Sequence, residues 1–308
     1  MQEKAYMSIR ASLLGFIMKL TVKKQFDALD GTVEAVTAFR KTMANSAQLS
    51  GAIPDKVSST PQKLNGVPCE WVTVEGIDQN RVLVYLHGGG YAMGGPDSHR
   101  DIAWRLSEAG GMRVLMVDYR LAPEDPFPAA VDDATNCYRW LVNEGFDPER
   151  IAIGGDSAGG GLAAALLVNL KNLGLPRPGC AILLSPWTDL SVSGESVKSN
   201  AKADVVLTER ALVTMADHYL GERDRKAPLA SPLFADLAGL PPILVQVGST
   251  EILFSDSEAF VKKVKTAGGK VTLEIFPKMP HVFQVFAARI PEGRDAIKKL
   301  GQFLLDNA

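Results

Sequence analysis

A Gly-x-Ser-x-Gly pentapeptide, Gly155-Asp156-Ser157-Ala158-Gly159, constrains the fold of this chain more than any other feature of its sequence. The apolar run before it, residues 150–154, is typical of a short buried strand, and the Ala- and Leu-rich run after it, residues 160–170, is typical of a helix. A strand, a sharp turn and a helix in this order expose the serine as a nucleophile. The pentapeptide therefore predicts an α/β fold with Ser157 at the end of a strand.

A second glycine motif, His87-Gly88-Gly89-Gly90, precedes the pentapeptide in the chain and follows another predicted strand, residues 81–86. Consecutive glycines leave backbone N–H groups bare, so that they can approach a reacting carbonyl group. One motif thus offers a nucleophile, and the other offers donors for the negative charge that its attack creates. The alternative is that both motifs are glycine turns that serve only close packing.

Strand and helix patterns alternate along most of the chain, which predicts a mostly parallel sheet covered by helices on both faces. Residues 51–67 are rich in Ser, Pro and Gly and are expected to form a linker. Residues 1–50 have helical patterns, and residues 188–222 interrupt the alternation. We expect these two segments to form a cap over the carboxyl ends of the strands, where such sheets bind ligands. The catalytic domain is then expected to comprise residues 51–187 and 223–308.

A nucleophilic serine needs a base, and the chain has four histidines. In folds with this type of serine turn, the chain order is nucleophile, acid, base. Only His281 follows Ser157 at a distance that leaves room for an acid after a strand, residues 243–247. Glu251 lies in the loop after that strand, whereas Asp256 lies nearer the next helix, whose positive end favours a carboxylate. We therefore expect Glu251 to orient His281, with Asp256 as the alternative acid.

The chain resembles the bacterial hormone-sensitive-lipase-like esterases, which have the α/β-hydrolase fold. The resemblance covers nearly the whole chain and rests on His87-Gly88-Gly89-Gly90-Tyr91, Asp118-Tyr119-Arg120-Leu121-Ala122-Pro123-Glu124, Gly155-Asp156-Ser157-Ala158-Gly159-Gly160, Ser185-Pro186-Trp187 and Ser231-Pro232-Leu233. It implies that Ser157 is the nucleophile and His281 the base, that the N–H groups of Gly88, Gly89 and Ala158 bind the oxyanion, and that His87 is structural.

The chain departs from the family pattern at Glu251-Ile252-Leu253, where relatives usually have Asp-Pro-Leu, and this departure keeps Asp256 open as the acid. A smaller departure is Asp125, where relatives often have His. The resemblance implies a serine carboxylesterase that acts on short- to medium-chain esters through an acyl-enzyme, without a cofactor or metal. An amidase or peptidase with the same triad is one alternative. A receptor-like binding module is another, although such relatives lack the histidine that this chain retains.

The acyl pocket is the least constrained part of the sequence. Four apolar residues flank the motifs and are candidates to line it, each being equally expected in the core: Met93, Trp187, Val282 and Phe283. Asp156, next to the serine, is a further candidate for contact with the substrate. A helical cap suggests, by analogy of fold, a closed pocket for small soluble esters.

Composition narrows the partners and the compartment. The formal charge is −2 and no long basic run is present, so a nucleic acid is not an expected partner. Cys69, Cys137 and Cys180 have no metal-site or disulfide-framework spacing, which favours buried thiols in a reducing compartment, the cytoplasm. The strand at residues 271–276 is expected at a sheet edge, where two copies of the chain can pair into a homodimer.

The N-terminal segment has one amphipathic helical pattern. Apolar side chains recur on one helix face at Ile9, Leu13, Phe16, Ile17 and Leu20. Neither a cleavage site nor the ~20 apolar residues of a membrane span is present. We expect this face to pack on the rest of the protein, and the alternative is a helix that lies on a membrane surface.

Overall fold

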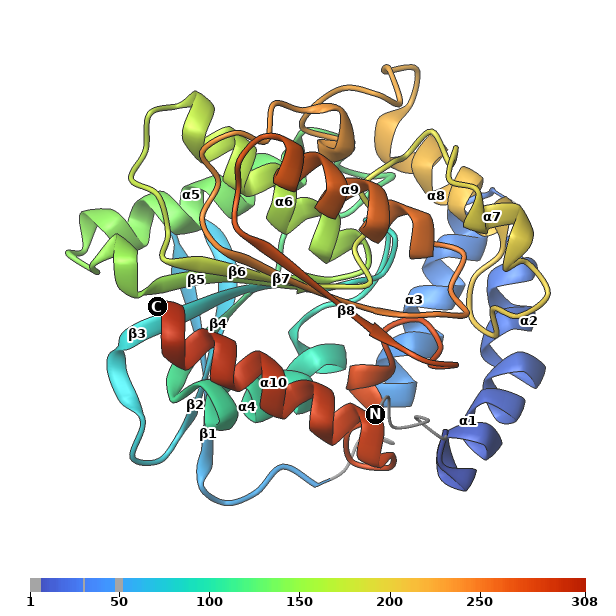
Figure 1. The fold of residues 1–308 in the computed structure, drawn as a ribbon, viewed down its shortest axis with the longest axis horizontal. Coiled ribbons are helices and arrows are strands. Elements are labelled where there is room, and N and C mark those ends of the chain that lie inside the picture. The colour runs from blue at the N-terminus through green and yellow to red at the C-terminus, as the bar shows by residue number, and fades with distance from the viewer. Residues whose placement is uncertain (1–6, 30, 48–51) are drawn as a thin grey trace.

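The computed structural model describes residues 7–29, 31–47 and 52–308, which form a twisted sheet between two layers of helices (Figure 1). The strands are β1 (Val57–Leu64), β2 (Val67–Val74), β3 (Asp78–Leu86), β4 (Met112–Val117), β5 (Ile151–Asp156), β6 (Cys180–Leu184), β7 (Ile243–Gly248) and β8 (Val271–Phe276). The α-helices are α1 (Ile9–Leu20), α2 (Val22–Asp27), α3 (Val33–Ala47), α4 (Pro96–Gly110), α5 (Ala129–Asn143), α6 (Ala158–Asn172), α7 (Ser196–Ser199), α8 (Glu209–Leu220), α9 (Phe254–Thr266) and α10 (Pro291–Asn307).

The eight strands lie in the order β1-β2-β4-β3-β5-β6-β7-β8. Pairs from β4 through β8 are parallel, and β1 and β2 are antiparallel additions at one edge. The prediction of a mostly parallel sheet is therefore confirmed. All carboxyl ends of the parallel strands meet at one edge of the sheet, and this edge carries both glycine motifs.

The expected linker at residues 51–67 is wrong at Val57–Leu64, because these residues form β1. This strand lies at the sheet edge and pairs only with β2, so six of its eight residues are exposed and its pattern has little apolar signal. Pro61 is tolerated there because an edge strand has no partner for one of its N–H rows. Asn65 and Gly66, both with positive φ, form the tight turn to β2.

The sheet buries two hydrophobic layers, because successive residues of a strand point to opposite faces. Leu86 and Val84 of β3 join the cluster under α5 and α6, whereas Leu83 and Tyr85 join the cluster under α4 and α10. In Figure 1, α5, α6 and α9 cover one face of the sheet, and α4 and α10 cover the other.

The predicted cap segments lie together at the carboxyl ends of the strands, where Figure 1 shows α1, α2 and α3 next to α7 and α8. The Lys23 ammonium of α2 donates to the carbonyl oxygens of Ala201 and Asp204, at 2.8 and 2.6 Å. Arg40 of α3 donates to the carbonyl oxygens of Ala92 and Ala122, beside the glycine loop. The Lys23 bonds thus join the two cap segments to each other, and the Arg40 bonds join the first cap segment to the body. The division of the chain into cap and catalytic segments stays a prediction.

The expected orientation of the N-terminal helix is wrong. Ile9, Phe16 and Leu20, on the face predicted to pack inward, are exposed on α1, and the opposite face carries the buried Ala11 and Met18. The apolar periodicity identified a helix face correctly but not the direction in which it points.

Candidate active site

Ser157 lies on a sharp turn between β5 and α6, with φ 55° and ψ −122°. Its N–H donates to the carbonyl oxygen of Leu184 at 2.8 Å, and its own carbonyl accepts from the N–H of Trp187 at 2.9 Å. A non-glycine residue with positive φ has a strained backbone, and these hydrogen bonds to the neighbouring strand and its loop hold Ser157 in this conformation. The turn also requires Gly159, because a Cβ atom there would lie 2.0 Å from the carbonyl oxygen of Leu86.

Three side chains predicted from the sequence lie in one hydrogen-bonded row. The Oγ atom of Ser157 is 2.9 Å from Nε2 of His281, and Nδ1 of His281 is 2.7 Å from Oε2 of Glu251. His281 follows β8 and Glu251 follows β7, so the carboxyl ends of adjacent strands bring both to the serine. In this geometry the imidazole can accept the serine proton while Glu251 holds one tautomer.

Glu251 is fully buried, and the bonds to its Oε1 atom come from the sheet edge. Its Oε1 atom accepts from the N–H of Gly248 and from the hydroxyl of Ser185 at 2.8 Å. The Ser185 hydroxyl also accepts from the N–H of Val282, next to His281. Sequence reasoning gave Ser185 no role, although the residue opens a motif, Ser185-Pro186-Trp187, that contributed to the family resemblance.

Asp256 makes no contact with His281 in this structure. Its Oδ2 atom accepts from the backbone N–H groups of Thr188 and Asp189, at 2.8 and 2.9 Å. Burial and the charge of Asp189 raise the pKa of Asp256 to about 8. Asp256 borders a separate hollow of about 790 Å³ that is also lined by Lys262. Its position supports a structural role at the start of the second cap segment.

The environment of His281 favours its charged form. Burial alone lowers the pKa of His281, but the hydrogen bond and charge of Glu251, with the charges of Asp204 and Asp156, outweigh it and raise the pKa. Such a balance suits a group that takes up a proton during a reaction.

The glycine loop differs from the expectation at Gly88. The Gly88 N–H donates to Oδ1 of Asp156 at 3.1 Å, so this donor is already engaged, and its expected role in the oxyanion hole does not agree with the structure. The N–H groups of Gly89 and Gly90 meet no acceptor within the described residues, and both residues have positive φ. The N–H of Ala158, the first residue of α6, is likewise unpaired among them, as at any helix start.

Asp156, Tyr85 and His99 form a buried polar group behind this loop. Asp156 was predicted to contact substrate, but it is buried, and its Oδ1 atom accepts from the Tyr85 hydroxyl at 2.9 Å as well as from the N–H of Gly88. Nε2 of His99 lies 3.3 Å from the same oxygen. Burial alone lowers the pKa of His99, but the Asp156 carboxylate outweighs it and raises the pKa.

His87 lies against this group as a neutral ring. Burial and the nearby charge of His99 lower the pKa of His87 to about 3. Its ring stacks on Tyr119 with centroids 4.2 Å apart, and its Nδ1 atom is 2.9 Å from the carbonyl oxygen of Gly88. These contacts agree with the structural role expected for His87.

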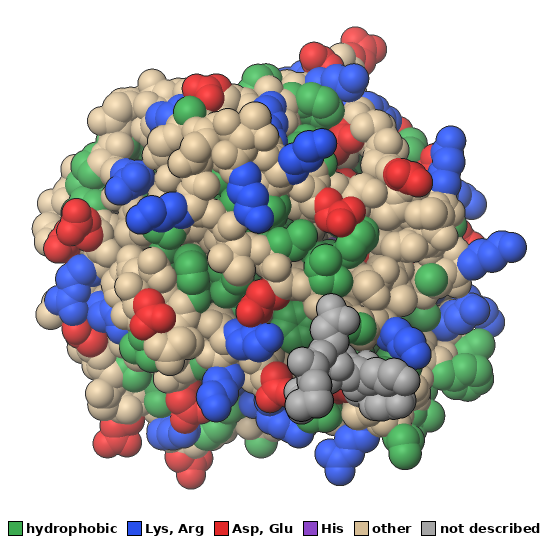
Figure 2. Space-filling view, viewed as in Figure 1, with side chains coloured by type: hydrophobic (Ala, Val, Ile, Leu, Met, Phe, Trp, Pro, Cys, Tyr) green, Lys and Arg blue, Asp and Glu red, His purple; other side chains and the backbone are tan. Residues whose placement is uncertain are grey.

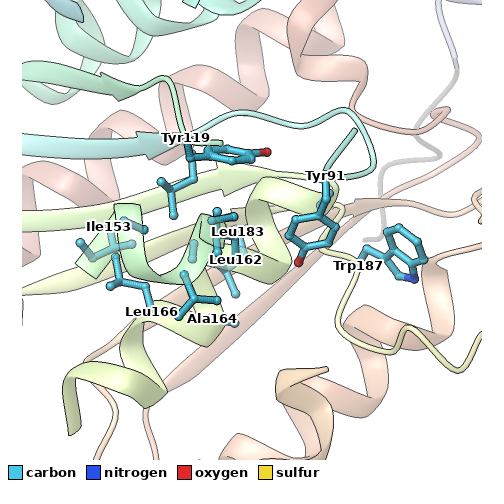
Figure 3. Packing of buried hydrophobic residues seen from close by; sticks show 14 of the residues in the cluster. Tyr91, Tyr119, Ile153, Leu162, Ala164, Leu166, Leu183 and Trp187 are labelled. Carbon is cyan, nitrogen blue, oxygen red and sulfur yellow. The ribbon is translucent and has the colours of Figure 1, made fainter. Parts of the chain in front are cut away.

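The other predicted pocket residues pack in the core. Met93 and Trp187 are 0% and 1% exposed, and Val282 and Phe283 are also buried. Figure 3 shows Tyr91 and Trp187 at the edge of the cluster in which Leu162 and Leu183 lie between α6 and the sheet. The burial of Met93 and Trp187 agrees with the core alternative, and their place in an acyl pocket stays a prediction.

The cap reaches the glycine loop through Met215 of α8, a residue that sequence reasoning missed. A Cβ atom at Gly90 would lie 1.9 Å from the Met215 sulfur atom, so the two residues are in close contact.

In the residues that the structure describes, no three His, Cys, Asp or Glu side chains are grouped to hold a metal ion, and no helix has the length and apolarity to cross a membrane.

Comparison with known proteins places this geometry among related sequences and structures. A family model described as "alpha/beta hydrolase fold" matches residues 83–285. An acetyl-hydrolase of Streptomyces hygroscopicus is 46% identical over 235 residues, which are 76% of this chain and 78% of that protein. An esterase of Acinetobacter venetianus is 39% identical over 248 residues, 80% of this chain and 82% of its own. The crystal structure of an esterase from the bacterial hormone-sensitive lipase family is 41% identical, with a TM-score of 0.92 over 98% of this chain and 99% of that one.

Proposed function

This chain belongs to the bacterial hormone-sensitive-lipase-like esterases of the α/β-hydrolase fold and is a carboxylic ester hydrolase, and we propose that it cleaves short- to medium-chain esters through an acyl-enzyme on Ser157. The observation that carries the mechanism is the row of hydrogen bonds from Ser157 through His281 to Glu251, at 2.9 and 2.7 Å. The name of the Streptomyces relative, acetyl-hydrolase, supports a short acyl group.

In the first step, the Ser157 oxygen attacks the ester carbonyl carbon while Nε2 of His281 takes the serine proton. The C–O bond to the alcohol then breaks, and the alcohol leaves with the proton from His281. In the second step, a water molecule gives its proton to His281 and attacks the acyl-enzyme, which releases the carboxylic acid and restores Ser157. Glu251 stabilises the imidazolium that forms twice in each cycle.

We assign the oxyanion hole to the N–H groups of Gly89, Gly90 and Ala158. Two of these were expected from the sequence, and Gly90 replaces Gly88 because the Gly88 N–H is held by Asp156. Loss of one such donor is expected to cost about a hundredfold in rate. Asp156 thus acts as a positioning residue that turns the loop so that the next two N–H groups face the serine.

The proposal is tested by hydrolysis of p-nitrophenyl esters from acetate to palmitate with the wild type and Ser157→Ala. We expect turnover that is highest at short chains and falls by about 10⁴-fold or more in the variant. Turnover that persists in Ser157→Ala would disprove the assignment of the nucleophile. Equal turnover of p-nitroanilides would favour the amidase alternative.

We also propose two finer points that rest on single features. Strand β8 lies at one edge of the sheet, with Ile275 exposed, which supports pairing of two copies through this strand. A monomer in light scattering at micromolar concentration would contradict the pairing.

The three cysteines are buried and free, which supports residence in the reducing cytoplasm. Cell fractionation checks this proposal.

A further inference from the structure

Helix α1 of the cap carries an apolar stripe that faces solvent. Half of the large hydrophobic side chains that are exposed in the described residues belong to this single helix. The stripe consists of Ile9, Leu13, Phe16, Ile17 and Leu20, which are 88%, 59%, 62%, 48% and 47% exposed. At about 100° per residue these five positions fall within about a third of the helix circumference. Scattered exposed hydrophobic residues are ordinary, but a continuous stripe marks an interaction surface.

The stripe is held in a fixed direction, because the opposite face of α1 is packed. Ala11 and Leu14 lie in a cluster with Met279 and Phe283, which flank His281. At its N-terminus, the backbone N–H and the hydroxyl of Ser8 both donate to the carboxylate of Glu292 on α10. The exposure of the stripe is therefore not that of a frayed helix end.

The charges around the stripe have one sign. Arg10, Lys19 and Lys24 are exposed beside it, and the sequence has no Asp or Glu between Met7 and Phe26. The protein as a whole has a formal charge of −2, so this segment is locally basic on a slightly acidic molecule. Figure 2 shows hydrophobic side chains next to Lys and Arg side chains at the lower right edge, where Figure 1 places α1.

We propose that the α1 stripe docks on an anionic lipid–water interface. A helix with an apolar face and flanking basic residues lies in the plane of such an interface, with its apolar side chains in the headgroup–acyl boundary and its cations near the lipid phosphates. A second copy of the chain is the less favoured occupant. Symmetric pairing through α1 would bring Arg10 and Lys19 of both copies together, and one helix face is small against the ~800 Å² that each partner of a stable pair buries.

The docking gives the cap a defined role in substrate supply, a consequence that rests on the proposed function. Because α1 shares an apolar cluster with Met279 and Phe283, which flank His281, the docked helix and the candidate site share one end of the molecule. Esters that partition into the interface then reach the site from the side on which they are concentrated.

The test is flotation of the protein with phosphatidylcholine vesicles, with and without phosphatidylglycerol. We expect the wild type to float with the anionic vesicles and to be released by salt. The double variant Leu13→Ser and Phe16→Ser should bind at least about tenfold more weakly, because two large apolar side chains are lost from the boundary. The variant Arg10→Gln and Lys19→Gln should lose the preference for phosphatidylglycerol.

A matched control removes two hydrophobic side chains of similar exposure from the body, in Leu173→Ser and Leu305→Ser, which are 51% and 49% exposed in the wild type. This control should float like the wild type, and circular dichroism should show all variants folded. Equal flotation of the wild type and the stripe variant would overturn the proposal. A dimer in light scattering that the stripe variant alone abolishes would also overturn it in favour of a second copy. Because flotation does not depend on hydrolysis, an inactive enzyme that still floats would contradict only the proposed function.

Discussion

The floor of the active site, by which we mean the turn that carries Ser157 and the sheet edge around it, differs from the cap in which atoms fix its structure. In the floor, backbone and glycine atoms set the positions: a Cβ atom at Gly159 would lie 2.0 Å from the Leu86 carbonyl oxygen, and one at Gly161 would lie 2.0 Å from that of Trp187. In the cap, side chains set the positions, and a Cβ atom at Gly15 of α1 would meet no atom within 4 Å. The floor therefore tolerates few substitutions, and it fixes the positions of the reacting groups. The cap tolerates more substitutions, and these can alter which molecules reach the floor.

The largest expected difference is between the two buried acids, Glu251 in the floor and Asp256 under the cap segment. Glu251→Gln should lower kcat by about 10⁴-fold, because the amide no longer stabilises charged His281. It should also move the acid limb of the kcat/KM profile to lower pH, since Glu251 raises the pKa of His281. Steady-state hydrolysis of p-nitrophenyl acetate over a pH series measures both effects.

Asp256→Asn is the matched variant for this comparison and should keep kcat within about tenfold of the wild type. The folded pKa of Asp256, about 8, lies above its ordinary value of 3.8, so the wild type loses stability as pH rises between these values. Removal of the carboxyl group should therefore stabilise the protein most at pH 8 and above, as measured by urea unfolding. A larger loss of kcat in Asp256→Asn than in Glu251→Gln would reverse the assignment of the acid.

The next largest difference concerns the glycines. Gly159→Ala should destabilise the fold by about 3 kcal/mol or more, because the added methyl group meets the backbone of Leu86 and His87, which cannot move aside. Gly15→Ala should instead stabilise the protein by up to about 1 kcal/mol, since alanine is the better helix former and the space is open. Urea unfolding of both variants checks the pair, and similar losses in both would mean that the floor is no tighter than the cap.

Sequence patterns predicted the parts of this molecule in which residue type determines position. The strand, serine and helix around Ser157, and the chain order of Ser157, Glu251 and His281, follow from motif and spacing. The Gly88 error arose because a glycine run shows that N–H groups are bare but not where each one points, and Asp156 decides that. The outward face of α1 was misjudged for a similar reason, because periodicity is the same for a stripe that faces a core or a lipid.

Edge position explains the missed strand β1. Most of its side chains face solvent, so Val57–Leu64 has neither the alternation nor the apolar content of a central strand. The Asn65-Gly66 pair, a strong hairpin signal, was available to reveal it. The core positions of Met93 and Trp187 had no comparable signal, because an apolar residue next to a motif is equally expected in a pocket and in a core.

Two of the three histidines that play no direct part in the proposed reaction, His99 and His218, provide a third comparison. His99→Gln should cost about 2 kcal/mol at low pH, because the charged ring no longer pairs with buried Asp156. The folded pKa of His99 is raised, so this stabilisation is complete below pH 6.5 and is lost as pH rises through the folded value. His218→Gln in α8 should change stability little, because the buried Nε2 atom of His218 has no partner among the described residues. Unfolding at several pH values should show a pH-dependent loss only for His99→Gln.

The smallest difference is expected from two buried tyrosines. Tyr119 donates to the carbonyl oxygen of His87 at 2.7 Å, and so supports the loop that carries Gly89 and Gly90. Tyr119→Phe should cost about 1 kcal/mol, because that buried carbonyl loses its partner. The hydroxyl of Tyr219 in the cap has no partner within the described residues, so Tyr219→Phe should be neutral or slightly stabilising while its ring keeps its stack on Tyr91 at 3.8 Å. Urea unfolding with p-nitrophenyl acetate turnover separates the outcomes, since only Tyr119→Phe should lower kcat. An equal loss of stability in both variants would mean that a hydroxyl bond in the floor contributes no more than an unpaired hydroxyl in the cap.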